Sequence, residues 1–333
     1  MHRESLTYIV VLNWNNWGDT IECLESVLRL DCPRFRVIVC DNQSEDGSVE
    51  IISEWVKGKV CAIAESSSMK QWIMPPVDKP IDFQIQDYPA IQKPDCRLTI
   101  LRTGANRGFA GGCNTGIKLA LQDKACTHVW LLNNDTIACP DTLRNLLDEM
   151  SAHPDMGLCG SLLYYYHSPD KIQAAGGRYQ RWLGTSGHIS LEEYEKGGLD
   201  YVVGASMLVS RDFLEKVGMM DESYFLYYEE NDWAVRGKKH FQIGTATKSI
   251  VFHKEGASTK AGSRFGKRQS PLADFYGMRN RLLFGRKHFP HYYPFVWLAT
   301  TLPIIKRLLR GEFSRAWRVL TLMWNPNQDY QSR

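Results

Sequence analysis

Hydrophobic residues in the first half of the chain form short β-branched runs that alternate with helical patterns. The runs Tyr8–Leu12, Arg36–Cys40, Leu98–Leu101 and His128–Leu132 have the length of buried strands. Between the first two runs, apolar residues repeat at helical spacing, as in Ile21, Leu24, Val27 and Leu28. Such alternation is typical of a mostly parallel sheet with helices on both faces. We therefore expect an α/β fold.

Two local patterns refine this picture. Asp19 is expected to cap the helix after the first strand, because Glu22 follows it three residues later, as in a capping box. Residues 64–96 show no periodicity and contain five prolines. We expect this segment to be an insertion or surface excursion without regular elements, because proline interrupts both helices and strands.

The cysteines and the apolar segments limit where the chain can function. Its 333 residues include nine cysteines but no C-x-x-C pair, so neither a disulfide framework nor a thiolate zinc site is expected. The first apolar run is too short for a signal peptide. The longest uncharged apolar stretch, Tyr292–Ile305, has 14 residues and is too short to cross a bilayer as a helix. We expect a cytoplasmic protein that does not span a membrane.

The net charge of +3 conceals a strong asymmetry along the chain. From Arg236 onward there are 19 Lys and Arg against 4 Asp and Glu, which leaves 21 basic and 33 acidic residues before that point. A basic end requires an anionic partner or a solvated surface. Nucleic acid, phospholipid headgroups and a phosphorylated substrate all meet that requirement.

Polar residues cluster just after the expected strands. Because ligands bind at the carboxyl edge of open α/β sheets, these clusters indicate a site, although Asn and Asp are also common in ordinary turns. The residues are Asn13, Asn15, Asp41, Asn42, Asn106, Asn133, Asn134 and Asp135.

The glycine pattern excludes two nucleotide-binding classes. The first strand–helix turn, residues 13–19, has a single glycine, and the glycine-rich segment lies at Gly104–Gly116 instead. Neither a G-x-G-x-x-G turn after the first strand nor a P-loop is present, so hydride transfer and P-loop chemistry are poor interpretations. Asp135 could hold Mg²⁺ or Mn²⁺ together with substrate phosphates, or it could simply cap the next helix.

The densest group of chemical side chains lies at residues 221–236. On a helix, Glu229, Asp232, Trp233 and Arg236 share one face, while Glu230 points about 100° away and can face a cleft. Adjacent carboxylates beside aromatic residues can have raised pKa values, which suits a general base. The alternative is an amphipathic helix with a solvated acidic face.

Further along the chain, His253 ends an apolar run. A single histidine in such a position is more often structural than a ligand. Arg279 and Arg281 stand among aromatic residues, and arginine forks suit diphosphate recognition.

Taken in order, these segments resemble the inverting nucleotide-sugar glycosyltransferases of family 2, especially the rhamnosyltransferase-like branch that builds bacterial cell-surface polysaccharides. The resemblance covers about residues 6–290. It rests on six ordered motifs: Val11-Leu-Asn-Trp-Asn15, Val39-Cys-Asp-Asn-Gln-Ser-Glu-Asp-Gly-Ser48, Asn106-Arg-Gly-Phe-Ala-Gly-Gly-Cys-Asn-Thr-Gly116, Leu131-Leu-Asn-Asn-Asp-Thr136, Tyr228-Glu-Glu-Asn-Asp-Trp233 and His253.

The resemblance implies the GT-A fold and a donor pocket for a nucleoside-diphosphate sugar of the dTDP-rhamnose or UDP-hexose type. Asn13 and Asn15 would lie near the nucleotide base, and Asp41 would contact its pyrimidine ring. The implied donor-binding residues are Asn13, Asn15, Asp41, Asn42, Asn106, Arg107, Gly108, Asn114, Asn133 and Asn134.

It also implies a metal and a base. Asp135 matches the metal-binding acid of the family's D-x-D motif, in which Asn133 replaces the first acid, and His253 matches a histidine that can complete a Mg²⁺ or Mn²⁺ site. Glu230 stands at the position of the catalytic base, and Glu229 is a competing assignment. The other implied residues are Asp232 in the catalytic group, and Trp233 and Arg279 near the acceptor or the diphosphate.

For the domain organisation, we expect a catalytic domain over residues 1–285, with a nucleotide-sugar half at about 1–136 and an acceptor half at about 137–285. Residues 286–333 form a helical, basic and apolar tail. We expect the tail to contact an anionic membrane surface on the inner face of the plasma membrane, where a lipid-diphosphate-linked or glycan acceptor would be presented. The alternative is a helix that packs on the catalytic domain.

Three other functions compete with this interpretation. A nucleotidyltransferase would need a basic, glycine-rich loop in its first turn, but residues 13–19 contain no Lys or Arg. A catalytically silent glycan-binding relative is disfavoured by the intact Glu229, Glu230 and Asp135. Nucleic-acid binding through the basic tail lacks a recognisable module, so nucleic acid is not an expected partner.

Overall fold

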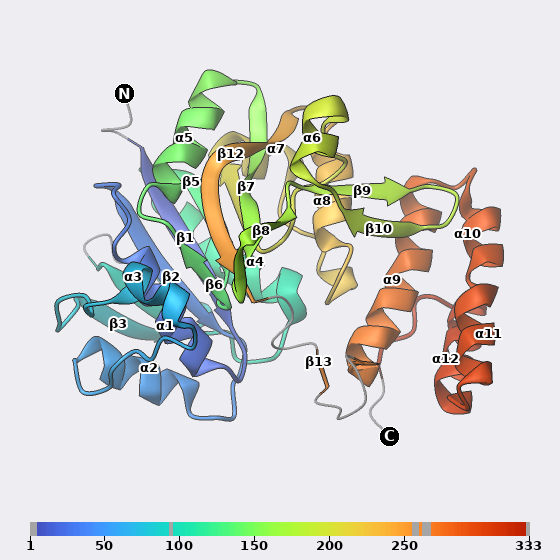
Figure 1. Ribbon diagram of the computed structural model, residues 1–333, viewed down its shortest axis with the longest axis horizontal. Helices are drawn as coiled ribbons and strands as arrows, with labels where there is room; N and C mark the ends of the chain where they lie inside the picture. Colours follow the sequence, from blue (N-terminus) through green and yellow to red (C-terminus); the bar gives the residue numbers. More distant parts are fainter. Residues whose placement is uncertain (1–4, 93–95, 255–259, 262–267, 331–333) are drawn as a thin grey trace.

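The computed structural model describes residues 5–92, 96–254, 260–261 and 268–330. A mixed sheet of ten strands forms its centre. These strands are β1 (Leu6–Asn13), β2 (Phe35–Asp41), β3 (Phe83–Asp87), β4 (Leu98–Arg102), β5 (Cys126–Asn133), β6 (Thr136–Ala138), β7 (Met156–Tyr165), β8 (Ser168–Ala174), β11 (Ser206–Ser210) and β12 (Gln242–His253). The strand order is β3-β4-β2-β1-β5-β11-β7-β12-β6, and β8 pairs with β7 (Figure 1).

Helices and smaller elements surround this sheet. A separate hairpin consists of β9 (Gly177–Gln180) and β10 (Thr185–His188), and β13 (Lys260–Ala261) pairs with β14 (Arg268–Gln269). The helices are α1 (Trp17–Val27), α2 (Ser48–Val56), α3 (Lys70–Ile73), α4 (Gly108–Leu121), α5 (Thr142–Ala152), α6 (Leu191–Gly197), α7 (Arg211–Val217), α8 (Glu229–Gly237), α9 (Pro271–His288), α10 (Tyr293–Ala299), α11 (Thr301–Leu309) and α12 (Phe313–Trp324).

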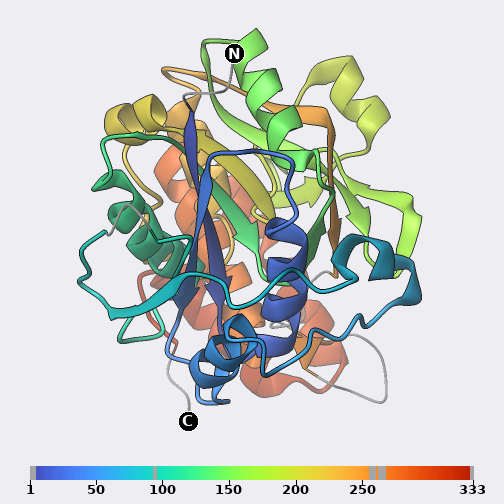
Figure 2. The ribbon, with the colours of Figure 1, turned by 90° about the vertical axis from the view of Figure 1, so that its left-hand side faces the viewer.

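The expected mostly parallel sheet covered on both faces is confirmed. β3, β4, β2, β1 and β5 run parallel, whereas β11 is antiparallel to β5. Along β1, Ile9 and Val11 pack in a core with α1, α2 and α5, while Tyr8 and Val10 pack in a second core with α4 and α7. This alternation is the period of a strand buried on both faces. Figure 2 shows the helices on the two sides of the sheet.

Two expectations about local structure were wrong. Asn16, rather than Asp19, caps α1, because its side-chain oxygen accepts a hydrogen bond from the Asp19 backbone N–H. The proline-rich segment 64–96 contains α3 and the edge strand β3, although residues 93–95 lie outside the described part. An edge strand has one unpaired side, and β3 pairs only with β4, so nearby prolines are tolerated there.

The C-terminal region is helical, as expected. The proposed boundary at 285/286 falls within α9, and α10 and α12 contribute to a common core with that helix, formed by Phe275, Leu282, Val296 and Leu322. In Figure 1, α9 to α12 stand together at the end of the molecule opposite β3. In the described part of the chain, no helix is both long and apolar enough to cross a bilayer.

Candidate active site

The ends of β1, β2 and β5 meet at one edge of the sheet. Asn13 lies opposite Asp41 in the β1–β2 register, and Leu12 lies opposite Asn133 in the β1–β5 register. The turns that follow these strands therefore bring together residues separated by up to about a third of the chain. This is the edge at which open α/β sheets bind ligands.

A chain of side-chain hydrogen bonds joins the three strand ends. The Asn13 amide donates to Asp41 Oδ2 at 2.8 Å, and the Thr20 hydroxyl donates to Asn13 Oδ1 at 2.7 Å. The Asn134 amide in turn donates to the Thr20 hydroxyl at 2.9 Å. Asn13 and Asp41 are both buried. The hydrogen bond between Asn13 and Asp41 fixes the ends of β1 and β2 relative to each other. It also occupies the polar groups that we assigned to nucleotide recognition.

Ser44 supports this contact from the next turn. Its backbone N–H donates to Asp41 Oδ1 at 3.0 Å, and its hydroxyl accepts from the Asn15 N–H at 2.9 Å. Asn15 has a φ of 51°, a conformation that Asn tolerates better than most residues. Its side-chain oxygen accepts from the Glu45 N–H at 2.7 Å. Sequence reasoning missed Ser44, although it lies inside one of the quoted motifs, and it also missed Thr20.

The glycine-rich turn before α4 is held by one asparagine. The Asn42 side-chain oxygen accepts from the Arg107 N–H at 3.0 Å, and its amide donates to Asn106 Oδ1 at 3.0 Å and to the Gly108 carbonyl at 3.1 Å. Asn106 also accepts from the Gly108 N–H at 3.0 Å. Asn42 therefore ties the end of β2 to the N-terminal turn of α4, and the Arg107 and Gly108 N–H groups of this turn are occupied by asparagine side chains.

The same turn contacts the loop that leads to the acidic helix. Gly108 has a φ of +65°, and a Cβ at this position would lie 2.1 Å from the Phe225 carbonyl oxygen. That oxygen accepts from the Phe109 N–H at 2.7 Å. Within α4, the Asn114 amide donates to the Met220 carbonyl and to Glu222. The expected donor residues thus position the 220–228 segment by direct contact.

The loop before α8 holds three non-glycine residues at positive φ, namely Phe225, Tyr227 and Tyr228. Such residues are uncommon and persist where the surroundings over-determine them. Here the Asn280 amide of α9 donates to three loop carbonyls, those of Tyr224, Leu226 and Tyr227, at 2.5 to 2.9 Å. The position of α8 is therefore fixed from both α4 and α9.

Glu229 and Glu230 begin α8 as a pair of carboxylates, of which Glu229 is buried and Glu230 is half-buried. Burial, and secondarily the Glu230 charge, raises the pKa of Glu229 well above its usual value; burial raises the pKa of Glu230 to about 7. The Oε2 atoms of both residues have no hydrogen-bond partner among the described residues. Glu229 is more deeply buried than Glu230. A carboxylate that titrates near neutrality and retains some access to solvent has the properties of a general base.

The two carboxylates face different neighbours. The pKa of the buried Cys113 thiol in α4 is raised by burial and then by Cys40 and Glu229. The pKa of the Tyr201 phenol is raised by burial and then by Glu230. The Glu229 charge therefore acts on Cys113 of α4, and the Glu230 charge acts on Tyr201.

Three other residues of the expected catalytic and acceptor groups make extensive protein contacts. Asp232 binds Arg236, Lys287 and His288 at 2.6 to 2.7 Å. Burial alone would raise the pKa of Asp232, but these three partners lower it well below its usual range.

Trp233 and Arg279 are similarly engaged. Trp233 is fully buried and donates its indole N–H to the Gly218 carbonyl. The buried Arg279 donates to the Ser223 and Gln328 carbonyls at 2.7 Å each. In these positions, both side chains support the loop and α8.

Asp135 and His253 lie side by side, from the turn after β5 and the end of β12. His253 Nε2 lies 3.3 Å from Asp135 Oδ1, yet it makes no hydrogen bond with any described residue. His253 Nδ1 contacts Gln173 Oε1 at 2.8 Å. An Nδ1–H that donates to this oxygen leaves the Nε2 lone pair directed at the carboxylate. This donor set fits a divalent cation, with Gln173 orienting the imidazole, and sequence reasoning missed Gln173.

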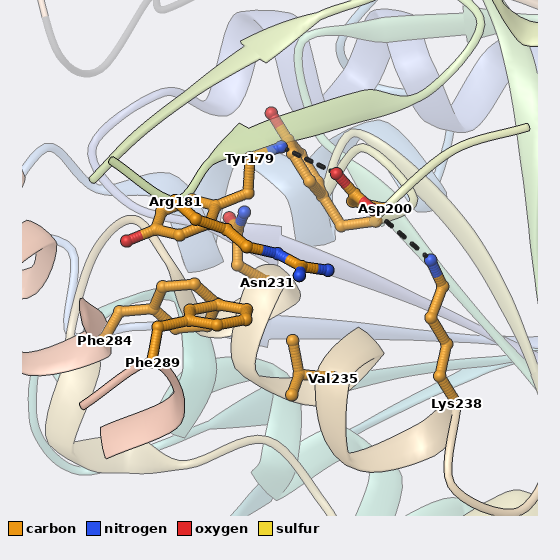
Figure 3. A pocket seen from close by; sticks show the side chains of 9 residues that line it. Tyr179, Arg181, Asp200, Asn231, Val235, Lys238, Phe284 and Phe289 are labelled. Atoms are coloured by element: carbon orange, nitrogen blue, oxygen red, sulfur yellow. Dashed lines mark hydrogen bonds and ion pairs between the residues drawn. The ribbon is translucent and has the colours of Figure 1, made fainter. Parts of the chain in front are cut away.

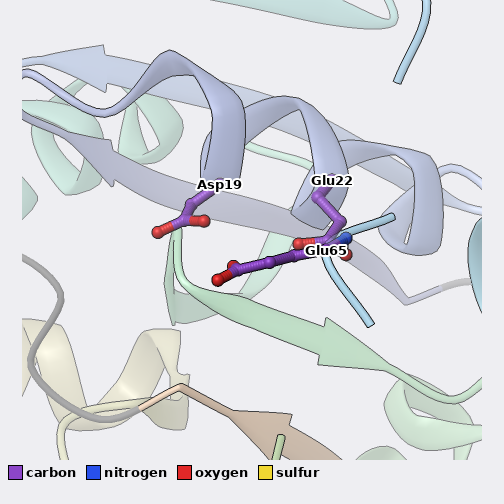
Figure 4. A group of neighbouring side chains, drawn as sticks. All are labelled: Asp19, Glu22 and Glu65. Carbon is purple, nitrogen blue, oxygen red and sulfur yellow. Dashed lines mark hydrogen bonds between the residues drawn. The ribbon is translucent and has the colours of Figure 1, made fainter. Parts of the chain in front are cut away.

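Asp19, Glu22 and Glu65 form an acidic cluster (Figure 4), which Lys254 connects to this pair. The carboxylate oxygens of Asp19, Glu22 and Glu65 lie within 4.8 Å of one another. Lys254 Nζ contacts them at 2.5, 2.7 and 2.5 Å, and the Lys254 backbone N–H donates to the Asp135 carbonyl. Lys254, the residue after His253, therefore offsets part of the negative charge of this cluster and is anchored by it. The sequence offered no signal for this arrangement.

A cavity of about 200 Å³ borders the first turns of α8 (Figure 3). Asn231, the neighbour of Glu230, lines it, and so does Tyr201. Asp200 accepts from the Tyr179 N–H at 3.0 Å and pairs with Lys238 at 3.7 Å. The wall of the cavity combines aromatic rings with the Asp200 carboxylate and with cations, including Arg181. This composition suits a hydroxyl-rich or anionic ligand.

Comparison with known proteins identifies relatives with the same architecture. A hexosyltransferase of low-salt glycan biosynthesis, Agl10 from Haloferax volcanii, is 26% identical over 192 residues, which are 54% of this chain and 58% of that protein. The chain thus spans little more than half the length of this relative. The mannosyltransferase PcManGT from Pyrobaculum calidifontis, solved with GDP-Man and Mn²⁺, has a TM-score of 0.52 at 13% identity, over 98% of this chain and 88% of its own.

Two further solved structures share the fold. GalNAc-T7 with UDP, GalNAc and Mn²⁺ has a TM-score of 0.55 at 13% identity, over 84% of this chain and 48% of its own. TarS 1-349 of S. aureus has a TM-score of 0.50 at 13% identity, over 87% and 69%. Residues 8–67 and 84–218 match the family described as "Glycosyl transferase family 2". The chain therefore belongs to glycosyl transferase family 2 and has a GT-A-like fold.

Proposed function

We propose that the protein transfers a sugar from a nucleoside-diphosphate sugar to a hydroxyl group of an acceptor, in a single displacement that inverts the anomeric carbon. The observation that carries this proposal is the carboxylate pair Glu229–Glu230, held at the start of α8 by contacts from the glycine-rich turn and from α9. Glu230 removes the proton of the attacking hydroxyl, because its pKa of about 7 lets it accept a proton near neutral pH.

Asp135 and His253 would hold Mg²⁺ or Mn²⁺, and such an ion neutralises negative charge on a departing diphosphate. The structures with Mn²⁺ among the fold relatives support a divalent metal. On the donor side, Asn42 and Asn106 would act by holding the turn at Gly108 in place, because their side chains bond to each other and accept from the Arg107 and Gly108 N–H groups. The roles of the donor residues remain proposals drawn from this geometry.

For the donor, we propose a dTDP-rhamnose or UDP-hexose type of sugar nucleotide, with the chain in the rhamnosyltransferase-like branch. Asp41 and Asn13 would then meet the nucleobase through groups that now contact each other. The relatives include one structure with GDP-Man and one with UDP. Sugar and base should therefore be screened together.

For the acceptor, we propose a glycan or a lipid-diphosphate-linked glycan of bacterial cell-surface polysaccharide synthesis. The cavity beside Asn231 supports the acceptor side, because its cations and aromatic rings suit such a molecule. We also propose peripheral attachment at the inner face of the plasma membrane through the region after residue 285.

The test is a screen of sugar nucleotides by thermal shift and product analysis with Mg²⁺ or Mn²⁺ present. We expect one sugar nucleotide to raise the melting temperature in a metal-dependent manner and to release a nucleoside diphosphate. NMR of the glycoside would then show inversion. Release of pyrophosphate would instead indicate a nucleotidyltransferase, and sugar binding without turnover of any donor would indicate a silent relative.

A further inference from the structure

Exposed apolar side chains are concentrated at one end of the molecule. Of the sixteen large apolar residues that are exposed in the described part of the chain, ten lie on α10, α11 and α12 and two lie in the turn of the β9–β10 hairpin. Several are strongly exposed, such as Leu309 at 83% and Trp324 at 77%. Large apolar patches are rare on soluble proteins and mark interaction sites.

The residues on the helices form two stripes at helical spacing. The first stripe runs along α10 and α11, which meet at Thr300 in right-handed helical conformation. It consists of Phe295, Leu298, Leu302, Ile305 and Leu309. The second stripe lies on α12 and consists of Phe313, Trp317, Leu320 and Trp324. Each stripe repeats every three or four residues, so its side chains share one helix face.

The hairpin turn extends the first stripe. The Trp182 ring packs edge-on against Tyr292 at 4.8 Å and against Phe295 at 4.6 Å between ring centroids. Even so, 56% of Trp182 and 49% of Leu183 stay exposed. The Leu183 carbonyl accepts from Arg281 Nε of α9 at 2.9 Å, which fixes the turn. The turn and the first stripe therefore present one surface, although more than 100 residues separate them in sequence.

Charge indicates which partner this surface fits. Residues 286–330 contain seven Lys and Arg but only two acidic residues, Glu312 and Asp329. Lys306 on α11 and Arg310, the residue just after this helix, are both exposed. A second copy of the chain would bring these cations against each other. An anionic bilayer instead offers apolar chains to Trp, Phe and Leu, and phosphates to Lys and Arg.

We propose that the docking surface, defined as the two stripes together with Trp182 and Leu183, binds the interface of an anionic phospholipid bilayer. This proposal rests on the membrane attachment that forms part of the proposed function. It adds that the β9–β10 hairpin, outside the C-terminal helices, also contacts the membrane. The Gly184 carbonyl, next to this turn, accepts from the Tyr228 hydroxyl at 2.8 Å, and Tyr228 immediately precedes Glu229. The surface that meets lipid is therefore directly connected to the loop that carries the carboxylate pair.

The experiment is flotation of the full chain with vesicles of phosphatidylcholine, with and without phosphatidylglycerol. We expect binding only when phosphatidylglycerol is present. Trp317→Ala and Trp182→Ala should each weaken vesicle binding about tenfold, since each removes a large aromatic group from the lipid contact. Ile91→Ala is the matched control, because Ile91 is 78% exposed but lies after β3, outside the docking surface. It should bind like the unaltered chain.

Three results would overturn the proposal. These are no vesicle binding by the unaltered chain, unchanged binding by Trp182→Ala, and a dimer in sedimentation that Trp317→Ala dissociates. Hydrolysis of the sugar nucleotide in solution separates this proposal from the proposed function. A chain that binds vesicles but never cleaves a donor keeps the docking surface and loses the enzymatic proposal. A chain that cleaves the donor but does not bind vesicles keeps the enzymatic proposal and loses the docking surface.

Discussion

Replacing Glu230 by Gln removes a charge whose formation is opposed by burial. The pKa of Glu230 rises from 4.5 to about 7 in the folded chain. A carboxyl with a raised pKa favours the folded state when it is protonated, so its contribution is complete below about pH 4.5 and is lost as the pH rises towards 7. With these two pKa values, ionisation of Glu230 lowers the free energy of unfolding by about 1 kcal/mol at pH 5 and by about 3 kcal/mol at pH 8, relative to the protonated carboxyl.

Glu230→Gln removes that cost but leaves a buried amide without a partner, which costs about 1 kcal/mol. The amide cost does not depend on pH, so the difference between the two pH values isolates the carboxylate. We expect the substitution to be about 2 kcal/mol more favourable at pH 8 than at pH 5. For a chain of this length, that difference corresponds to about 3 °C in melting temperature.

The assay is differential scanning calorimetry of both proteins at pH 5 and pH 8, with sugar-nucleotide turnover measured on the same samples. Turnover should fall by about 10²- to 10⁴-fold, the usual contribution of a general base, and the turnover of the unaltered enzyme should rise with pH through about 7. A melting-temperature change that is equal at the two pH values would refute the reasoning, because it would show that Glu230 is not held in a raised-pKa environment.

Other substitutions test the surrounding contacts. Gly108→Ala should lower the free energy of unfolding by about 3 kcal/mol or more and reduce turnover, because its Cβ would meet the Phe225 carbonyl. Gly104 is also at positive φ but has open space around it, so Gly104→Ala should lower the free energy of unfolding by only about 1 kcal/mol. Equal unfolding free energies for the two variants would contradict this. Lys254→Met should cost about 3 kcal/mol at pH 7 by leaving the acidic cluster unpaired, and its denaturant midpoint should recover as the pH falls. Asp135→Asn should weaken Mn²⁺ binding in calorimetric titration more than tenfold; unchanged affinity would exclude this site.

The parallel half of the fold could be predicted from the sequence because its strands are buried on both faces. Continuous apolar runs such as Tyr8–Leu12 report directly on such strands. β3 could not be predicted, since it is an edge strand whose residues are mostly half-exposed, and its apolar signal is weak beside several prolines. The cap of α1 was misassigned because Asp19 belongs to the acidic cluster, whose lysine comes from 235 residues further along the chain.

The residues of the candidate site likewise divide into those that could be predicted from the sequence and those that could not. Motif residues such as Asn42 and Gly108 could be located because local turn chemistry requires Asn and Gly at those positions. The raised pKa values of Glu229 and Glu230 agree with the interpretation of adjacent carboxylates beside aromatic residues, rather than with a solvated acidic face. Gln173 and Lys254 could not be found, because their roles depend on contacts between distant segments. The role of Trp182 likewise depends on the position of α10, which no pattern near residue 182 encodes.

The central claim about the proposed sugar transfer is that Glu230 takes the proton of the acceptor hydroxyl. The most direct test is the single-turnover rate of sugar transfer by Glu230→Gln, with the donor shown to be bound and with Glu229→Gln measured in parallel. We predict unchanged donor affinity and a loss of at least 10²-fold for Glu230→Gln, with a smaller loss for Glu229→Gln. Transfer by Glu230→Gln at a rate close to that of the unaltered enzyme would contradict the account.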